Sequence, residues 1–185
     1  MLDGIINMDE FGHILATRRK GEHVREVLTR QVQEASSDSV IEIEFSGVTV
    51  LDYSFADESI GKLLSRLVAG ELGEKYVILN GVKSDLKENI DVALKQRNLA
   101  VMSILDDGWE CMGVVKPHLL EVLELVNQNG TMTARELSER LQLALNTCSN
   151  RLGELFRLRL VSRKEDIIAS GGRQFIYRSL LCKDV

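Results

Sequence analysis

The stretch VIEIEFSGVTVLDYSFADESIGKLL, residues 40–64, decides the fold because a strand ends and a helix begins within it. Its first six residues place apolar side chains around Glu42 and Glu44, an alternation that is typical of a β-strand. From Ala56 onward the apolar residues recur at helical spacing as far as Val68, where glycines follow. The stretch therefore predicts a strand, a short connection and an amphipathic helix in immediate succession.

The segments on either side repeat this alternation of strand and helix. Strands are predicted at KYVILN (75–80) and LAVMSIL (99–105), and helices at GEHVREVLTRQVQEA (21–35) and SDLKENIDVALKQR (84–97). Near the amino terminus, GIINM and HILAT flank the turn-like DEFG and predict a β-hairpin. Residues 1–113 are therefore expected to form one α/β domain, with a mixed sheet covered by helices.

The pattern changes near Val114. The surrounding segment DDGWECMGVVKP has turn composition, and Pro117 suits the first position of a helix, where its missing N–H does no harm. Beyond it the sequence predicts three helices and a hairpin, and the second helix opens with a capping box of Thr133 and Glu136. Residues 114–185 are therefore expected to form a second, small domain.

The third helix of this domain, LNTCSNRLGELFRL, offers a polar face near its start. The side expected to be buried carries Leu145, Cys148, Leu152 and Leu155. Short polar side chains cover the other side, as on a recognition helix that enters the major groove. A basic hairpin follows, with strands in LVSRKED and RQFIYRSL joined by the loop IIASGG. The candidate DNA-binding residues are Asn146, Thr147, Ser149, Asn150 and Arg151 on the helix and Arg163, Lys164 and Arg173 on the hairpin.

Charge is distributed unevenly along the chain. The net charge is -5, but residues 115–185 carry eleven Lys and Arg against eight Asp and Glu, a net +3, which leaves -8 for the rest. The carboxy-terminal part is therefore the basic one, and it predicts duplex DNA as a partner.

Several functional classes find no support in the sequence. No apolar run approaches the ~18 to 20 residues that span a bilayer, so we expect no membrane contact and a cytoplasmic protein. The three cysteines and three histidines lack the spacing of a disulfide framework or a metal site. Neither a P-loop nor a dinucleotide-binding glycine motif occurs. We therefore expect no metal, no cofactor and no enzyme.

Ser54 stands at the junction of strand and helix. With Asp57 three residues later it fits the [ST]-x-x-[DE] pattern, which predicts that its hydroxyl caps the helix. The same segment, with Asp52, Asp57 and Glu58, is a candidate partner-docking edge, and these acids would repel a phosphate on the serine. Arg18, in the basic loop TRRKG, is a candidate contact for an acidic partner or for Asp52.

The carboxy-terminal part resembles a known module. ELSERLQLALNTCSNRLGELFRLRLVSR is similar to the winged helix-turn-helix of many bacterial transcriptional regulators, and the likeness extends over about the last seventy residues. Where such proteins often have glycine before the wing, this chain has Arg159, so a different helix ending is expected if that residue has a positive φ.

The amino-terminal part also resembles a known family. VIEIEFSGVTVLDYSFADESIGKLL is similar to the STAS-like bacterial proteins in which DFxGV precedes SFADE, relatives of the anti-sigma factor antagonists. In those antagonists a partner kinase phosphorylates a serine of MDSSGLG, and the resemblance places Ser54 at that position. Here Phe55 and Asp57 replace the glycines that follow the serine.

Together these features predict a DNA-binding transcriptional regulator whose STAS-like domain senses or docks a protein partner. The alternative is a protein-interaction adaptor that does not bind DNA, or an antagonist-like phosphoswitch whose partner is a histidine-kinase-like ATPase. A homodimer is compatible with either reading.

Overall fold

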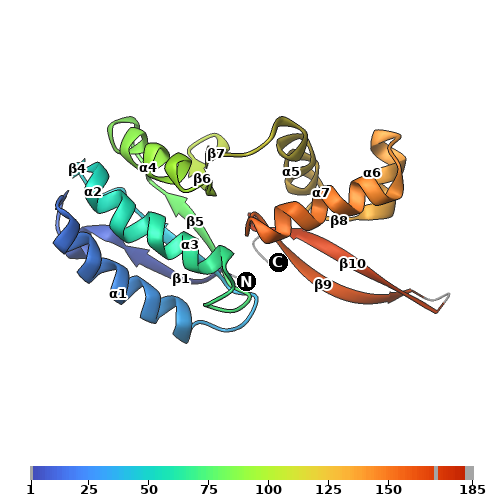
Figure 1. Cartoon of the computed structure of the whole chain (residues 1–185), viewed down its shortest axis with the longest axis horizontal. Helices are drawn as coiled ribbons and strands as arrows, with labels where there is room; N and C mark the ends of the chain where they lie inside the picture. Colours follow the sequence, from blue (N-terminus) through green and yellow to red (C-terminus); the bar gives the residue numbers. More distant parts are fainter. Residues whose placement is uncertain (1, 169–170, 182–185) are drawn as a thin grey trace. The chain divides into compact units, whose positions relative to one another are not determined.

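The computed structural model describes residues 2–168 and 171–181. The chain divides into two compact units, Met1–Val114 and Val115–Val185, each described by itself below (Figure 1). The expected hairpin loop at residues 167–172 falls partly outside the described residues.

A five-stranded mixed sheet forms the centre of the amino-terminal unit. Its order is β1-β3-β5-β6-β7, in which all neighbours are parallel except the last pair. The strands are β1 (Leu2–Asn7), β3 (Val40–Glu44), β5 (Tyr76–Asn80), β6 (Ala100–Leu105) and β7 (Gly108–Gly113). The expected mixed α/β architecture is confirmed.

Three helical stretches lie side by side along this sheet (Figure 1). They are α1 (Arg18–Glu34), the continuous run of α2 (Tyr53–Ala56), the π-helical segment η2 (Asp57–Gly61) and α3 (Lys62–Val68), and α4 (Ser84–Gln96). Apolar side chains of these helices join those of the strands in one core, which includes Val24, Leu28, Ile43, Leu63 and Leu79.

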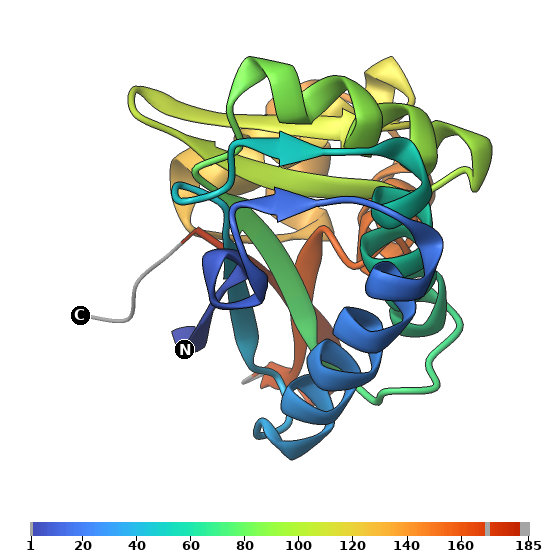
Figure 2. The same ribbon diagram turned by 90° about the vertical axis from the view of Figure 1, so that its left-hand side faces the viewer.

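The expected amino-terminal hairpin is wrong. β1 pairs with β3 in parallel, and β2 (Ile14–Leu15) pairs in parallel with β4 (Val50–Leu51) in a separate small sheet, where Figure 2 shows the two strands side by side. A 3-10 turn, η1 (Met8–Phe11), intervenes and buries Met8 completely. Because this buried turn redirects the chain, the two apolar runs reach different partners.

The segment expected to link the domains also differs, because part of it is the strand β7. It pairs with β6 in an antiparallel hairpin from Leu105 opposite Gly108 to Ala100 opposite Gly113. Met112 is its only fully buried side chain among the described residues of the strand. A strand with one buried side chain gives little hydrophobic alternation, so its sequence did not reveal it.

The carboxy-terminal unit has three helices and a three-stranded sheet of order β8-β10-β9. Its helices are α5 (Pro117–Asn129), α6 (Ala134–Leu141) and α7 (Leu145–Arg157), and its strands are β8 (Thr131–Thr133), β9 (Val161–Ile168) and β10 (Gly172–Ser179). The proline start of α5 and the Thr133–Glu136 capping box of α6 are confirmed. The expected burial of Leu145 is wrong, since 49% of that side chain is exposed at the first position of α7.

The end of α7 explains how an arginine replaces the usual glycine. Arg159 has a φ of 61°, its N–H donates to the carbonyl of Phe156, and the N–H of Leu160 donates to that of Leu155. This is the hydrogen-bond pattern of a Schellman ending with arginine in the left-handed position. The helix therefore ends in the usual way, at the conformational cost of a side chain at positive φ.

Candidate functional site

The start of α7 presents four of the predicted DNA-binding residues on one exposed surface. Asn146, Thr147, Ser149 and Asn150 are exposed, whereas the intervening Cys148 is fully buried. Their side chains are short and carry both hydrogen-bond donors and acceptors. These groups have the chemistry that a helix needs to contact base edges.

Arg151 does not share that surface. Its side chain is only 20% exposed and forms an ion pair at 3.6 Å with Glu121 of α5. It therefore joins two helices of the unit, which leaves it less available to a nucleic acid than its neighbours.

Arg163 joins the wing to the recognition helix. Its guanidinium lies 4.0 Å from the ring centroid of Phe156 on α7 and 4.2 Å from that of Phe175 on β10. A cation stacked between two aromatic faces is held by both, so this residue fixes the wing against α7.

The other two predicted cations of the wing are accessible. Arg173 is 81% exposed with Glu165 at 3.3 Å, and Lys164 is also exposed. An exposed ion pair of this kind contributes little to stability and is readily exchanged for a phosphate. Arg173 lines the same groove as Asn146 and Ser149 and adds positive charge to the polar surface of α7, whereas Lys164 alternates with Arg163 along β9 and lies on the other face of the wing.

A groove of about 260 Å³ lies between the starts of α6 and α7 and strand β10. Among its lining residues are Arg135, Leu145, Asn146, Ser149, Arg173 and Phe175. The sequence reasoning missed Arg135, which is exposed in the first turn of α6. Its position two residues after the confirmed cap, on the helix that precedes the recognition helix, was the available signal.

Asp52, and not Ser54, caps the helix in the amino-terminal unit. One carboxylate oxygen of Asp52 accepts the N–H of Phe55 at 2.7 Å, and the other accepts the N–H of Thr17 at 2.9 Å. Ser54 lies half-buried within the first turn of α2, where its carbonyl accepts the N–H of Asp57. The predicted serine cap is therefore wrong, because the helix begins at Tyr53.

Asp57 and Glu58 are buried in the π-helical segment and do not form an exposed acidic edge. Glu58 accepts hydrogen bonds from Arg18 at 2.9 Å, from Lys62 at 2.7 Å and from Arg25. Asp57 accepts from Arg97 at 2.6 Å and lies 3.7 Å from Arg18. We call these six side chains the ion centre, and list them as Arg18, Arg25, Asp57, Glu58, Lys62 and Arg97.

The ion centre also corrects the expectations for Arg18. This residue is the first of α1, not part of a loop, and it binds Glu58 rather than Asp52. Gly21 permits the approach of α1, because a Cβ there would lie 3.0 Å from the Cβ of Glu58 and 3.1 Å from the carbonyl oxygen of Phe55.

The cations of the ion centre stabilise the ionised form of Glu58. Burial alone would raise the pKa of Glu58, but hydrogen bonds and charges from Lys62 and Arg25 lower that pKa below its usual value. The hydrogen bond to Asp57 raises the pKa of Arg97. The cations around Glu58 therefore more than offset the effect of burial on its pKa. Within residues 2–168 and 171–181, no cluster of side chains has the composition of a metal site.

The cap predicts a difference between two neighbouring substitutions. Asp52→Ala should lower the free energy of unfolding by about 1–2 kcal/mol, because it removes the acceptor of two backbone N–H groups. Ser54→Ala should change it by less than about 0.5 kcal/mol. Urea denaturation measures both, with Asp52→Asn as the variant that retains one acceptor oxygen. Equal losses from Asp52→Ala and Ser54→Ala would contradict the assigned cap.

The ion centre predicts a pH-dependent contribution from Glu58. Because folding lowers its pKa, the stabilisation is complete above the ordinary value of 4.5 and is lost as the pH falls through the lowered pKa. Glu58→Gln should therefore cost about 3 kcal/mol at pH 7 and progressively less in acid. The matched control is Glu71→Gln, which removes an exposed partner of Arg66 and should cost at most about 1 kcal/mol. Denaturation at pH 7 and pH 3 tests this, and a loss independent of pH would refute it.

Comparison with protein families identifies both units. Residues 21–86, from α1 to the start of α4, match a STAS-like domain of unknown function (DUF4325). Residues 117–155, from the start of α5 to near the end of α7, match a winged helix-turn-helix DNA-binding family. A search of curated proteins found no match. None of the helices described here has the length and apolar character needed to cross a membrane. The chain therefore joins a STAS-like domain to a winged helix-turn-helix DNA-binding domain.

Proposed function

We propose that this protein is a non-enzymatic transcriptional regulator whose winged helix binds duplex DNA and whose STAS-like domain docks a protein partner. The observation that carries the first half is the exposed start of α7, which presents the polar side chains of Asn146, Thr147, Ser149 and Asn150. The match to a DNA-binding family supports the same reading.

The proposed contacts divide by chemistry. The amides of Asn146 and Asn150 are suited to the edge of adenine, which offers one donor and one acceptor in the major groove. The exposed cations Lys164 and Arg173 neutralise phosphates and set the orientation of the helix without reading sequence. Arg163 serves the same interface indirectly, since it fixes the wing against α7.

Binding should show the salt dependence of phosphate contact. With the full chain and a short duplex, Lys164→Ala and Arg173→Ala should each weaken binding and lower the slope of log affinity against log salt by about one. The matched control is Lys87→Ala, which removes an equal charge from the STAS-like domain. Fluorescence anisotropy at several salt concentrations measures the slope.

Asn150→Ala tests the readout of sequence separately. On duplexes selected from a random pool it should cost about 1–3 kcal/mol at one base position, with the salt slope unchanged. If the wild-type chain binds no duplex even at low salt, the DNA-binding function fails and the adaptor reading replaces it.

The partner-docking half rests on the surface around Ser54. Ser54 is half-buried in the first helical turn, and the directly paired Ile14 and Val50 on the adjoining strands are 59% and 47% exposed. Because Asp57 and Glu58 are neutralised by the ion centre, a phosphate on Ser54 would meet chiefly the charge of Asp52. We propose this surface as the docking edge, with a kinase-like ATPase as the partner that modifies Ser54.

That proposal predicts an effect of charge at one serine. Ser54→Asp should weaken binding of an ATPase encoded beside the gene, because it adds charge within the interface, and Ser54→Ala should not. Ser84→Asp is the control, since it adds the same charge at an exposed helix start elsewhere in the domain. Intact-mass analysis after co-expression detects the phosphate. Equal binding by all variants, with no phosphate on Ser54, would rule this role out.

A further inference from the structure

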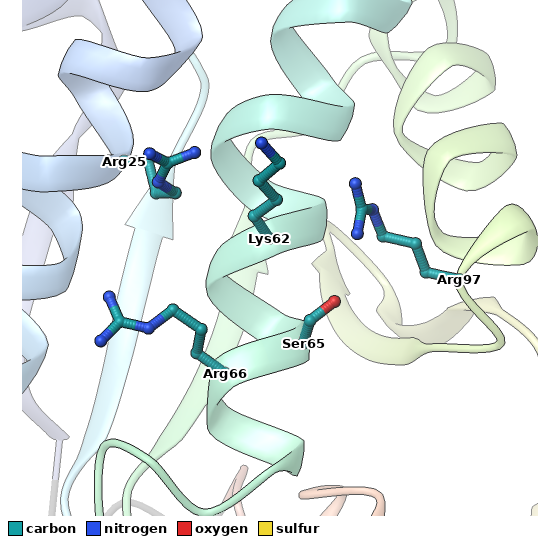
Figure 3. Close-up of a pocket in the computed structure, with 5 residues that line it drawn as sticks. All are labelled: Arg25, Lys62, Ser65, Arg66 and Arg97. Carbon is teal, nitrogen blue, oxygen red and sulfur yellow. The ribbon is translucent and has the colours of Figure 1, made fainter.

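Four cationic side chains and one serine line a cavity of about 450 Å³ in the STAS-like domain. Arg25 comes from α1, Lys62, Ser65 and Arg66 come from α3, and Arg97 follows the end of α4. Figure 3 shows Arg25 and Arg66 on the α1 side of α3, Arg97 on the opposite side and Lys62 between them. No carboxylate is among the described residues that line the cavity.

Buried acids hold these cations in place from below. Glu58 binds Arg25 and Lys62, and Asp57 binds Arg97. Both acids are at least nine-tenths buried, whereas the cations are between 18% and 39% exposed. The positive groups therefore face the solvent while the negative groups that position them lie beneath.

Two of the acids that pair with the lining cations are buried and two are exposed. Asp57 and Glu58 lie beneath the cations, whereas Glu22, 3.8 Å from Arg25, and Glu71, 2.8 Å from Arg66, are more than half exposed. Exposed ion pairs contribute little to stability, so an anion can replace these two partners. The surrounding domain has twenty acidic against twelve basic residues and repels anions as a whole. A cavity that gathers four of those twelve basic residues is therefore an exception within its own domain.

Hydrogen-bond donors remain for a ligand. Arg97 binds Asp57 through Nε, and Arg66 uses Nε for Glu71 and one Nη for Thr29. Among the described residues, no acceptor is recorded for the Nη groups of Arg97 or for the second Nη of Arg66. The hydroxyl of Ser65 donates to the carbonyl of Gly61, so it is not a donor for the ligand.

We propose that this cavity binds a small molecule through a phosphate or pyrophosphate group. The planar forks of arginine match the oxygens of such a group, and lysine adds a point charge. The site is a widely open depression with room for more than a single phosphate, so the part of a ligand beyond the anion stays in contact with solvent. No aromatic side chain is among the described lining residues, so recognition rests on the anion and not on a stacked base.

Calorimetric titration of the full chain with inorganic pyrophosphate at low salt tests the site. The wild-type protein should bind, and Arg66→Gln should weaken binding about tenfold by removing a charged donor. Arg66→Lys should restore part of the loss, since it returns the charge without the fork. Arg30→Gln is the matched control, an exposed arginine on the same helix as Arg25 and outside the cavity, and should bind as the wild type does. Among the described residues, the partners of Arg66 are the exposed Glu71 and the hydroxyl of Thr29, so these variants should keep their fold, which circular dichroism checks.

Further titrations distinguish binding at this site from binding of anions elsewhere on the protein. Arg173→Ala in the wing should leave pyrophosphate binding unchanged. Inorganic phosphate, a sugar phosphate and a nucleoside monophosphate in parallel titrations identify what surrounds the phosphate group. Absence of pyrophosphate and phosphate binding by the wild type, or equal losses in Arg66→Gln and Arg30→Gln, would overturn the proposal. So would a phosphopeptide or duplex DNA that competes for these residues more tightly than every small molecule.

Discussion

The burial of Asp57 and Glu58 in one turn of helix is the constraint on which the amino-terminal domain depends. Two adjacent carboxylates away from water are tolerated only when opposite charges reach them with good geometry. Here those charges come from α1, from α3 itself and from the end of α4. The acids thus determine how three helices lie along the sheet. The same contacts orient the partly exposed cations of the ion centre.

In the winged helix, too, a cation holds two elements together. Arg163 lies between Phe156 and Phe175, which belong to α7 and β10. Its charge is used for internal positioning, while Arg173 and Lys164 remain exposed. In both domains, some arginines make internal contacts that position neighbouring elements, and others are exposed to solvent.

Features with a strong local signal were predicted from the sequence. The start of α5 at Pro117, the Thr133–Glu136 box and the central strands at residues 40–44 and 76–80 follow from local chemistry and hydrophobic pattern. Both families were recognisable for the same reason, since their motifs are contiguous in the chain.

Features that depend on distant partners were not predictable. Asp52 is held in the capping position because it also accepts the N–H of Thr17, thirty-five residues earlier. The sequence around Ser54 gives no sign of that hydrogen bond. β7 forms because its backbone pairs with the edge strand β6, not because of its own hydrophobic pattern. The ion centre draws cations from α1, α3 and the end of α4, and each of them alone has the sequence context of a solvated surface residue. The spacing of these cations along the chain does not indicate that they meet in the folded domain.

The π-helical segment Asp57–Gly61 has a consequence for the phase of the helix that contains it. A residue advances an α-helix by about 100°, and a π turn accommodates roughly one additional residue, so it absorbs that rotation and keeps the helix before it in phase with the helix after it. Phe55 and Leu63, both fully buried, are eight residues apart but are oriented like residues seven apart in a regular helix. Loss of a single residue from the π turn would restore a regular helix and leave α3 in its present phase. Loss of a residue within α3 has no such turn to absorb it and would rotate Arg66 relative to Lys62.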